Sequence, residues 1–276
     1  MSMERSAFSA IGGTIVAVLA LVATLAPVLA PFDPLAIAGP SLAAPSGAHL
    51  LGTNDVGQDI LSQLIWGTRA SLMVALPAAT LAVAAGVLVG GLAGLLRGWV
   101  DVVAMRSVDL FLALPMLPLL ILIAALTGPS RATVTVVIAL AAWPGIARIV
   151  RSQTLSLAGQ GHVRAARGFG AGPLYVIRRH LAPALAPDIA ANLVYWAATA
   201  LVLQAGLAFL GLSDPTEVTW GSVLNRALDH EGIHFTNQWL WWALPAGLAI
   251  TLAAVGLAFL GVAFESRANP RWNRTR

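Results

Sequence analysis

Long stretches without a charged residue constrain this chain most. A helix that crosses the hydrocarbon core of a bilayer needs about 20 mostly apolar residues, because lipid cannot satisfy backbone hydrogen-bonding groups. Charged residues make up only 10% of the 276 residues, too few to cover a water-soluble globule. The sequence therefore predicts an all-α integral membrane protein with six spans: Ser6–Phe32, Ala70–Leu96, Leu110–Ser130, Ala132–Ala147 with an extension toward Leu157, Ile189–Ser213 and Gly232–Phe264.

The N-terminus has an alternative interpretation as a cleaved signal peptide. Arg5 would supply the basic region, and the small residues near Ala26 to Ala30 would supply the cleavage site. The apolar stretch is much longer than the roughly 7 to 15 residues of a usual signal-peptide core. We therefore expect an uncleaved first span.

The arginines predict the orientation of the chain, which has no Lys. An even number of spans places both termini on one side. If that side is the cytoplasm, 13 arginines fall inside, and three, Arg69, Arg131 and Arg226, fall outside. Because cytoplasmic loops retain positive charge, we expect both termini in the cytoplasm. Membrane orientation then explains the basic charge of the chain better than nucleic-acid binding does. We therefore expect the chain to contact membrane lipid and to bind no nucleic acid.

The spans divide the chain into three parts. Residues 1–69 hold the first span and an outer segment, whose second half, residues 55–65, has apolar residues at near-helical spacing. Residues 70–271 form a core of five spans, with a short cytoplasmic helix at about residues 160–172. Residues 272–276 form a cytoplasmic tail.

Small residues and prolines mark two of the spans. Gly86, Gly90 and Gly94 recur every four residues, so they share one helix face and allow close approach of another helix, within the chain or from a second subunit. Pro115 and Pro118 lie inside the third expected span, where a missing donor and a ring clash bend a helix. We expect packing at the glycines and a bend at the prolines.

Few polar residues lie within the spans. Asn192 and Gln204 could line a polar pathway or form hydrogen bonds between helices. A secondary transporter or channel is an alternative class, but it would need ionisable groups within the membrane. Asp109 and Asp188, near span ends, give that alternative little support.

One motif of soluble metalloproteases occurs in an outer loop. His230, Glu231 and His234 match H-E-x-x-H, which on a helix places two imidazoles one turn apart for zinc. Gly232 disfavours a helix there, and no third acidic ligand follows nearby. A membrane metalloprotease is therefore a weak alternative, and no metal site is expected. Asp55 and Asp59, four residues apart, are explained more simply by N-capping or solvent exposure.

The segment between the fourth and fifth spans is basic. A helix there would begin after Gly159 and Gly161 and end at Gly170 or Gly172, before Pro173. So short a helix needs a surface to pack on. Anionic lipid is one candidate surface, favoured by its arginines. A protein groove is the other, favoured by the alanines and glycines, which offer lipid little apolar area. The apolar residues of the helix are Val163, Ala165, Ala166 and Phe169.

These residues carry a family resemblance. The run Arg164-Ala-Ala-Arg-Gly-Phe-Gly170, with Ile177 and Pro183, resembles the Glu-Ala-Ala…Gly…Ile…Leu-Pro signature of ABC importer permeases. Further stretches are similar to the dipeptide, oligopeptide and nickel branch, and to its C-type subunit in particular. These are residues 51–72, Gly98-Trp-Val-Asp101 with Arg106 and Asp109, Ala113-Leu-Pro115, residues 142–151, Phe209-Leu-Gly-Leu212, Trp220-Gly221 and Asn269-Pro-Arg271.

The resemblance implies the type I importer permease fold and a coupling helix that docks into a cytoplasmic ATPase. The residues carried over for this role are Val163, Arg164, Ala165, Ala166, Arg167, Gly170 and Pro183. Two positions depart from the signature, because Arg164 replaces its Glu and Ala182 replaces the Leu before the closing proline. Replacing an anion by a cation reverses the electrostatics of that contact, so we expect the ATPase pocket to differ from the usual one.

The chain is not expected to be an enzyme. A phosphate-binding G-x-x-x-x-G-K-[ST] sequence is absent, since the chain has no Lys. No cofactor is therefore expected on this chain, and ATP and Mg would be bound by two partner ATPase subunits or domains. The resemblance implies two further partners, a second homologous permease and an extracytoplasmic solute-binding protein. Its breadth makes di- and oligopeptides the first choice of substrate, with nickel or a metal chelate as the alternative.

Overall fold

The computed structural model describes residues 2–268, and all regular elements in that range are helical. In chain order they are α1 (Ser2–Leu29), α2 (Ile60–Leu96), α3 (Gly98–Ala113), α4 (Met116–Thr127), α5 (Arg131–Ala158), α6 (Gly161–Gly168), α7 (Pro173–Val176), the π-helix η1 (Ile177–Leu181), α8 (Ala182–Phe209), α9 (Trp220–Asp229), the 3-10 helix η2 (Asn237–Leu240) and α10 (Ala243–Ala268).

The predicted membrane architecture is confirmed. Among the described residues, five helical stretches are long and apolar enough to cross a bilayer, and α3 with α4 makes a sixth candidate if the bent pair counts as one span. The five are Phe8–Leu29, Ile60–Leu96, Arg131–Ala158, Pro173–Phe209 and Asn237–Gly261.

The third span differs from its prediction as one kinked helix. Helix α3 ends at Ala113, α4 begins at Met116, and the two axes meet at 86°. Leu114 has extended backbone (φ −81°, ψ 136°), as a residue before proline prefers, and Pro115 is also extended (φ −68°, ψ 116°). Pro115 therefore lies at a complete break of the helix instead of a bend, whereas Pro118 lies in the first turn of α4.

Several helix boundaries also differ from expectation, and one of them is the start of the fifth span, expected at Ile189, where α8 begins at Ala182. Helix α2 begins at Ile60 and continues to Leu96, so the expected division after residue 69 falls within it. Its N-cap is Asp59, whose carboxylate accepts a hydrogen bond from the Ser62 amide at 2.8 Å, which confirms the capping interpretation. Helix α10 begins at Ala243, eleven residues after the expected start at Gly232, because a turn and η2 occupy the intervening chain.

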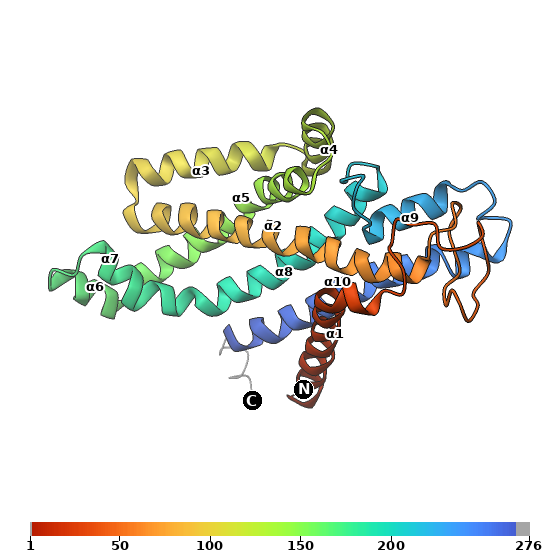
Figure 1. Cartoon of the computed structure of the whole chain (residues 1–276). Coiled ribbons are helices and arrows are strands. Elements are labelled where there is room, and N and C mark those ends of the chain that lie inside the picture. The colour runs from red at the N-terminus through yellow and green to blue at the C-terminus, as the bar shows by residue number, and fades with distance from the viewer. Residues whose placement is uncertain (1, 269–276) are drawn as a thin grey trace.

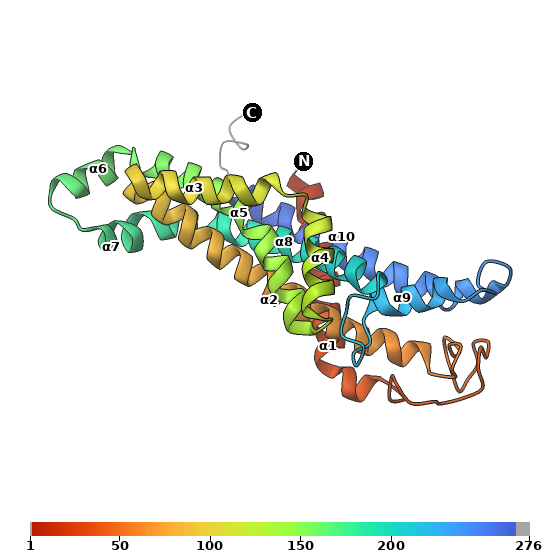
Figure 2. The same cartoon turned by 90° about the horizontal axis from the view of Figure 1, so that it is seen from above.

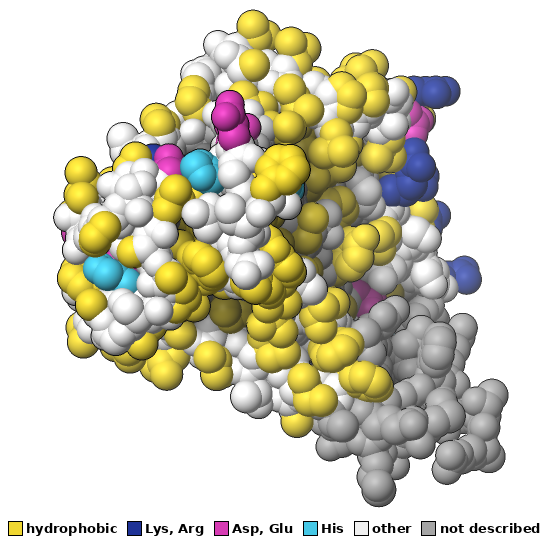
Figure 3. Space-filling model, turned by 90° about the vertical axis from the view of Figure 1, so that its right-hand side faces the viewer, with side chains coloured by type: hydrophobic (Ala, Val, Ile, Leu, Met, Phe, Trp, Pro, Cys, Tyr) yellow, Lys and Arg dark blue, Asp and Glu magenta, His cyan; other side chains and the backbone are white. Residues whose placement is uncertain are grey.

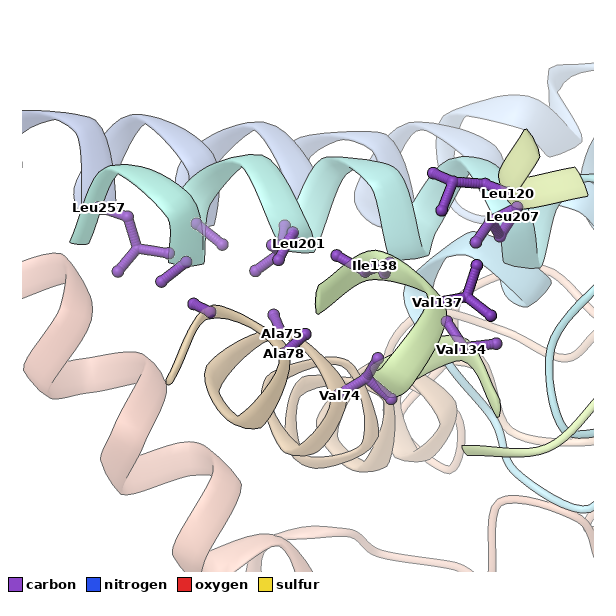
Figure 4. Packing of buried hydrophobic residues seen from close by; sticks show 14 of the residues in the cluster. Val74, Ala75, Ala78, Leu120, Val134, Val137, Ile138, Leu201, Leu207 and Leu257 are labelled. Atoms are coloured by element: carbon purple, nitrogen blue, oxygen red, sulfur yellow. The ribbon is translucent and has the colours of Figure 1, made fainter. Parts of the chain in front are cut away.

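The long helices α2, α5 and α8 run along the molecule, with α6 and α7 at one end and α9 at the other (Figures 1 and 2). The loop before α2 lies at the α9 end, where Asp55 pairs with Arg226 at 2.7 Å. A buried apolar cluster joins the long helices (Figure 4). It includes Val74, Ala75 and Ala78 of α2, Val134, Val137 and Ile138 of α5, Leu201 and Leu207 of α8, Leu120 of α4 and Leu257 of α10.

The three regularly spaced glycines of α2 all face α5. A Cβ atom at Gly86 would lie 2.6 Å from Cβ of Ile146, and one at Gly94 would lie 2.8 Å from Cβ of Thr154. A Cβ atom at Gly90 would overlap the carbonyl oxygen of Ala147. The close approach is therefore within the chain, and α2 and α5 run parallel in backbone contact.

Helices α1 and α10 form an antiparallel pair. The Phe8 and Phe259 rings lie 5.0 Å apart, and Ile15, later in α1, faces Gly256, which is earlier in α10. The start of α1 therefore lies beside the C-terminal half of α10.

At the α9 end, each arginine has a partner. Arg226 pairs with Asp55, and Arg131 donates from Nε to Glu217 at 3.0 Å. The guanidinium of Arg69 lies 5.8 Å from the centroid of the Trp66 ring. Figure 3 views the molecule from this end and shows Asp, Glu and His side chains among hydrophobic ones, with arginines projecting mainly at one edge.

Candidate functional site

The segment from α6 to α7 forms a hairpin that projects from the ends of α5 and α8 (Figures 1 and 2). Helix α5 ends at Ala158, and Gly159 caps it with its amide directed to the Leu155 carbonyl. Helix α6 follows after only two residues. The predicted short helix is therefore present, although it ends at Gly168, before the expected glycines.

Gly170 terminates α6 by a Schellman motif. Its φ of +85° is left-handed, its amide donates to the Arg167 carbonyl, and the Ala171 amide donates to the Ala166 carbonyl, both at 3.0 Å. These bonds satisfy two carbonyls that a helix end leaves free. A left-handed φ favours Gly, so the sequence dictates where the helix stops.

Val163 packs α6 against the ends of the neighbouring helices. Its side chain is 1% exposed and packs with Leu95 at the end of α2 and with residues of the following segment, namely Val176, Leu181 and Leu185. The resemblance implies a docking role for Val163, but its side chain points into the protein and does not form the outer face. It supports the helix from beneath.

The outer face of α6 is basic and small. Arg164, Ala165 and Arg167 are exposed, and Ala166 is half-buried. The sequence predicts Phe169 as part of the apolar content of the helix, and the structure places it just outside the helix. Phe169 lies after the last helical residue and is 92% exposed.

Pro183 lies exposed in the first turn of α8, immediately after the π-helix η1. The Ala182 amide donates to the Ile177 carbonyl, five residues back, and Pro183 has no amide to donate. The wider turn therefore joins α7 to α8 as one continuous helical run from Pro173 to Phe209.

The two candidate pathway residues lie on α8 and form no hydrogen bond to another helix among the described residues. Asn192 donates to the Asp188 carbonyl within the helix at 2.9 Å. Gln204 is 1% exposed, and its Oε1 atom has no hydrogen-bond partner in the described part of the chain. The structure does not bring these two side chains together.

The H-E-x-x-H residues lie on a turn. Helix α9 ends at Asp229, His230 caps it with extended backbone (φ −74°, ψ 119°), and Glu231 and His234 follow in the turn. The helix that places two imidazoles one turn apart is therefore missing. In residues 2–268, no group of three or more His, Cys, Asp or Glu side chains is placed to hold a metal ion.

Sequence reasoning missed the residues that support α6. Leu95, Leu181 and Leu185 come from three elements and meet only in the folded chain. No local sequence pattern predicts the exposure of Phe169, because apolar residues at positions 163, 166 and 169 would also be expected on a buried helix face. The positive φ of Gly170, in contrast, was indicated by a glycine placed just after a helical pattern.

Five apolar helical spans, or six if α3 with α4 counts as one, and a short helix exposed on a hairpin define a multi-pass membrane protein, and comparison with known proteins identifies the family. The chain belongs to the binding-protein-dependent transport system inner membrane components, whose family pattern matches residues 86–274. It is a multi-pass inner-membrane permease subunit of an ABC importer, and in such systems this subunit is not catalytic.

Named relatives narrow the resemblance. A protein of Brucella suis biovar 1 (strain 1330) that bears the provisional name peptide permease protein is 36% identical over 230 residues, which cover 83% of this chain and 75% of that protein. The nickel transport system permease protein NikC of Escherichia coli (strain K12) is 34% identical over 259 residues, 93% of this chain and 91% of that protein. The chain therefore lies in the peptide and nickel branch.

A solved structure supports the fold alone. A chain of the MetNI methionine ABC transporter, in an inward-facing conformation, superposes with a TM-score of 0.55 at 19% identity. The match covers 75% of this chain and 95% of that chain.

Proposed function

We propose that this chain pairs with a second, homologous permease to form the pathway of an ATP-driven importer, and that α6 couples the pathway to two cytoplasmic ATPase subunits or domains. In this arrangement the α6 end faces the cytoplasm and the α9 end meets a solute-binding protein outside. The ATPases bind ATP and Mg, and this chain binds no cofactor.

The observation that carries the proposal is the packing of α6 against the ends of two spans. Its outer face is free, whereas Val163 beneath it touches the end of α2 and the start of α8. A force applied to α6 therefore acts on two spans at once. Because α2 and α5 are in backbone contact along Gly86, Gly90 and Gly94, α5 would move with α2. A rigid element of this kind can transmit ATPase closure to the pathway.

Di- and oligopeptides are the proposed substrates, since the relatives with 36% identity bear peptide permease names. Nickel or a nickel chelate is the second candidate. It is supported by the relative NikC, which matches over nearly the full length of both chains.

The test is reconstitution of the complex that a tagged copy of this chain recovers from its native membrane. We expect mass spectrometry to find a second permease and ATP-binding subunits. Proteoliposomes supplied with the solute-binding protein should take up labelled peptides only with ATP. Nickel uptake without peptide uptake would show that nickel, and not a peptide, is the substrate. Uptake that needs neither ATP nor an ATP-binding subunit would overturn the proposal.

A further inference from the structure

The α6 to η1 segment, residues 159–181, is a surface of uncompensated positive charge. It contains Arg164, Arg167, Arg178 and Arg179, all exposed, and no Asp or Glu. None of these arginines forms an ion pair with another described residue. The three arginines of the opposite end each have a partner, so the free charge is a property of this surface.

Phe169 gives the same surface an apolar anchor. At 92% exposure it is the most exposed large hydrophobic side chain of the described residues. The Schellman motif at Gly170 fixes the backbone next to it, so the ring is presented from an ordered turn. Aromatic and Arg side chains that are exposed on a rigid element are typical anchors of protein interfaces.

The composition of α6 favours a protein partner over a lipid surface. A helix that lies on a membrane presents a broad stripe of large apolar residues. The one large aliphatic residue of α6, Val163, is turned inward, and its outer face carries Ala and Arg. A single projecting ring beside cations fits a pocket with an anionic rim better than a bilayer.

Resting on the proposed function, we infer that the ATPase groove that receives α6 is acidic and contains an apolar pocket for Phe169. Arg164 and Arg167 pair with carboxylates of the groove, where complementary charge fixes the choice of partner. A permease with the signature Glu at position 164 would need a groove with positive charge at this contact. This permease therefore selects an ATPase whose groove carries negative charge opposite Arg164 and Arg167.

The first experiment measures how much ATPase remains bound to the tagged complex as salt rises. From about 0.1 M to about 1 M salt, the Debye length falls from roughly 10 to 3 Å, so retention should fall steeply. Arg164→Glu with Arg167→Glu should lower retention at least about tenfold, whereas Arg164→Lys should keep most of it. Arg106→Glu makes the charge change of one of these two substitutions at an exposed site outside the surface and should have no effect.

Phe169 has its own matched pair. Phe169→Ala should release ATPase at all salt concentrations, and Phe235→Ala, 91% exposed at the opposite end, should not. Neither ring is buried, so both variants should insert and unfold like the wild type, and thermal melting checks this. A photo-crosslinking residue at position 169 should attach to an ATPase segment that has Asp or Glu within a few positions.

The outcomes separate the two proposals. If ATPase stays bound to the charge-reversed variant, or if the crosslinked segment is rich in Lys and Arg, the groove is not acidic although the coupling function stands. If retention is unchanged but ATP hydrolysis in nanodiscs loses its dependence on phosphatidylglycerol in that variant, the surface binds lipid and the inference fails. If no ATPase accompanies the wild type, the proposed function fails first.

Discussion

The absence of a side chain at Gly90 allows α2 and α5 to approach closely. Replacing it with Ala would place a methyl group on the Ala147 carbonyl oxygen, so α2 and α5 would have to separate. We expect a loss of about 1–3 kcal/mol, as for other overpacked interiors. Thermal unfolding in detergent measures it. Gly91→Ala is the control, because no atom lies within 4 Å of the added methyl group. Equal melting temperatures for the two variants would contradict the close contact.

Arg97 is held in an unfavourable conformation. Its φ of 57° is left-handed, and it links the end of α2 to α3. A side chain in this conformation costs roughly 1–2 kcal/mol, which Gly does not incur. Arg97→Gly should therefore raise the melting temperature. Arg97→Ala removes the same charge but keeps Cβ, so it should not; a gain in both variants would attribute the effect to charge.

At the scale of single elements, Gly170 determines whether α6 stays closed at its end. Gly170→Ala meets no neighbouring atom, so its effect should come from the left-handed φ alone, at about 1–2 kcal/mol. Hydrogen exchange should then accelerate at the amides of Gly170 and Ala171, which close the cap. Gly168→Ala lies in the helix with open space around it and should slow exchange in α6. Faster exchange in both variants would show that the cap is not responsible.

The elements also show what the sequence can predict. Charge-free length located the spans, because lipid excludes charge whatever the tertiary structure. The end of α6 was bracketed by its glycines, because a left-handed cap is a local property. The 86° break at Leu114 and Pro115 was expected only as a bend, since proline removes a bond without fixing the angle that follows. The inward position of Val163 depends on Leu95, 68 residues away, and no local pattern contains it.

At the scale of the whole molecule, the two ends differ in how their charge is held. Arginines at the α9 end are bound to Asp55, Glu217 or the Trp66 ring, whereas those of residues 159–181 are free. A neutralised end is easier to pass across a membrane than one with free cations. The pairing of arginines at the α9 end therefore supports the predicted orientation, which until this point rests on the number of arginines on each side.

This orientation can be tested directly because the chain contains no cysteine. Phe169→Cys and Phe235→Cys place thiols at two sites that are 92% and 91% exposed, with the single span of α8 between them. In spheroplasts that express the chain without ATPase subunits, an impermeant maleimide should label position 235 at once and position 169 only after permeabilisation. Ala200→Cys, at a fully buried site, should stay unlabelled in both conditions. The reverse order would invert the molecule, and labelling of both sites from outside would show that α8 does not cross the membrane.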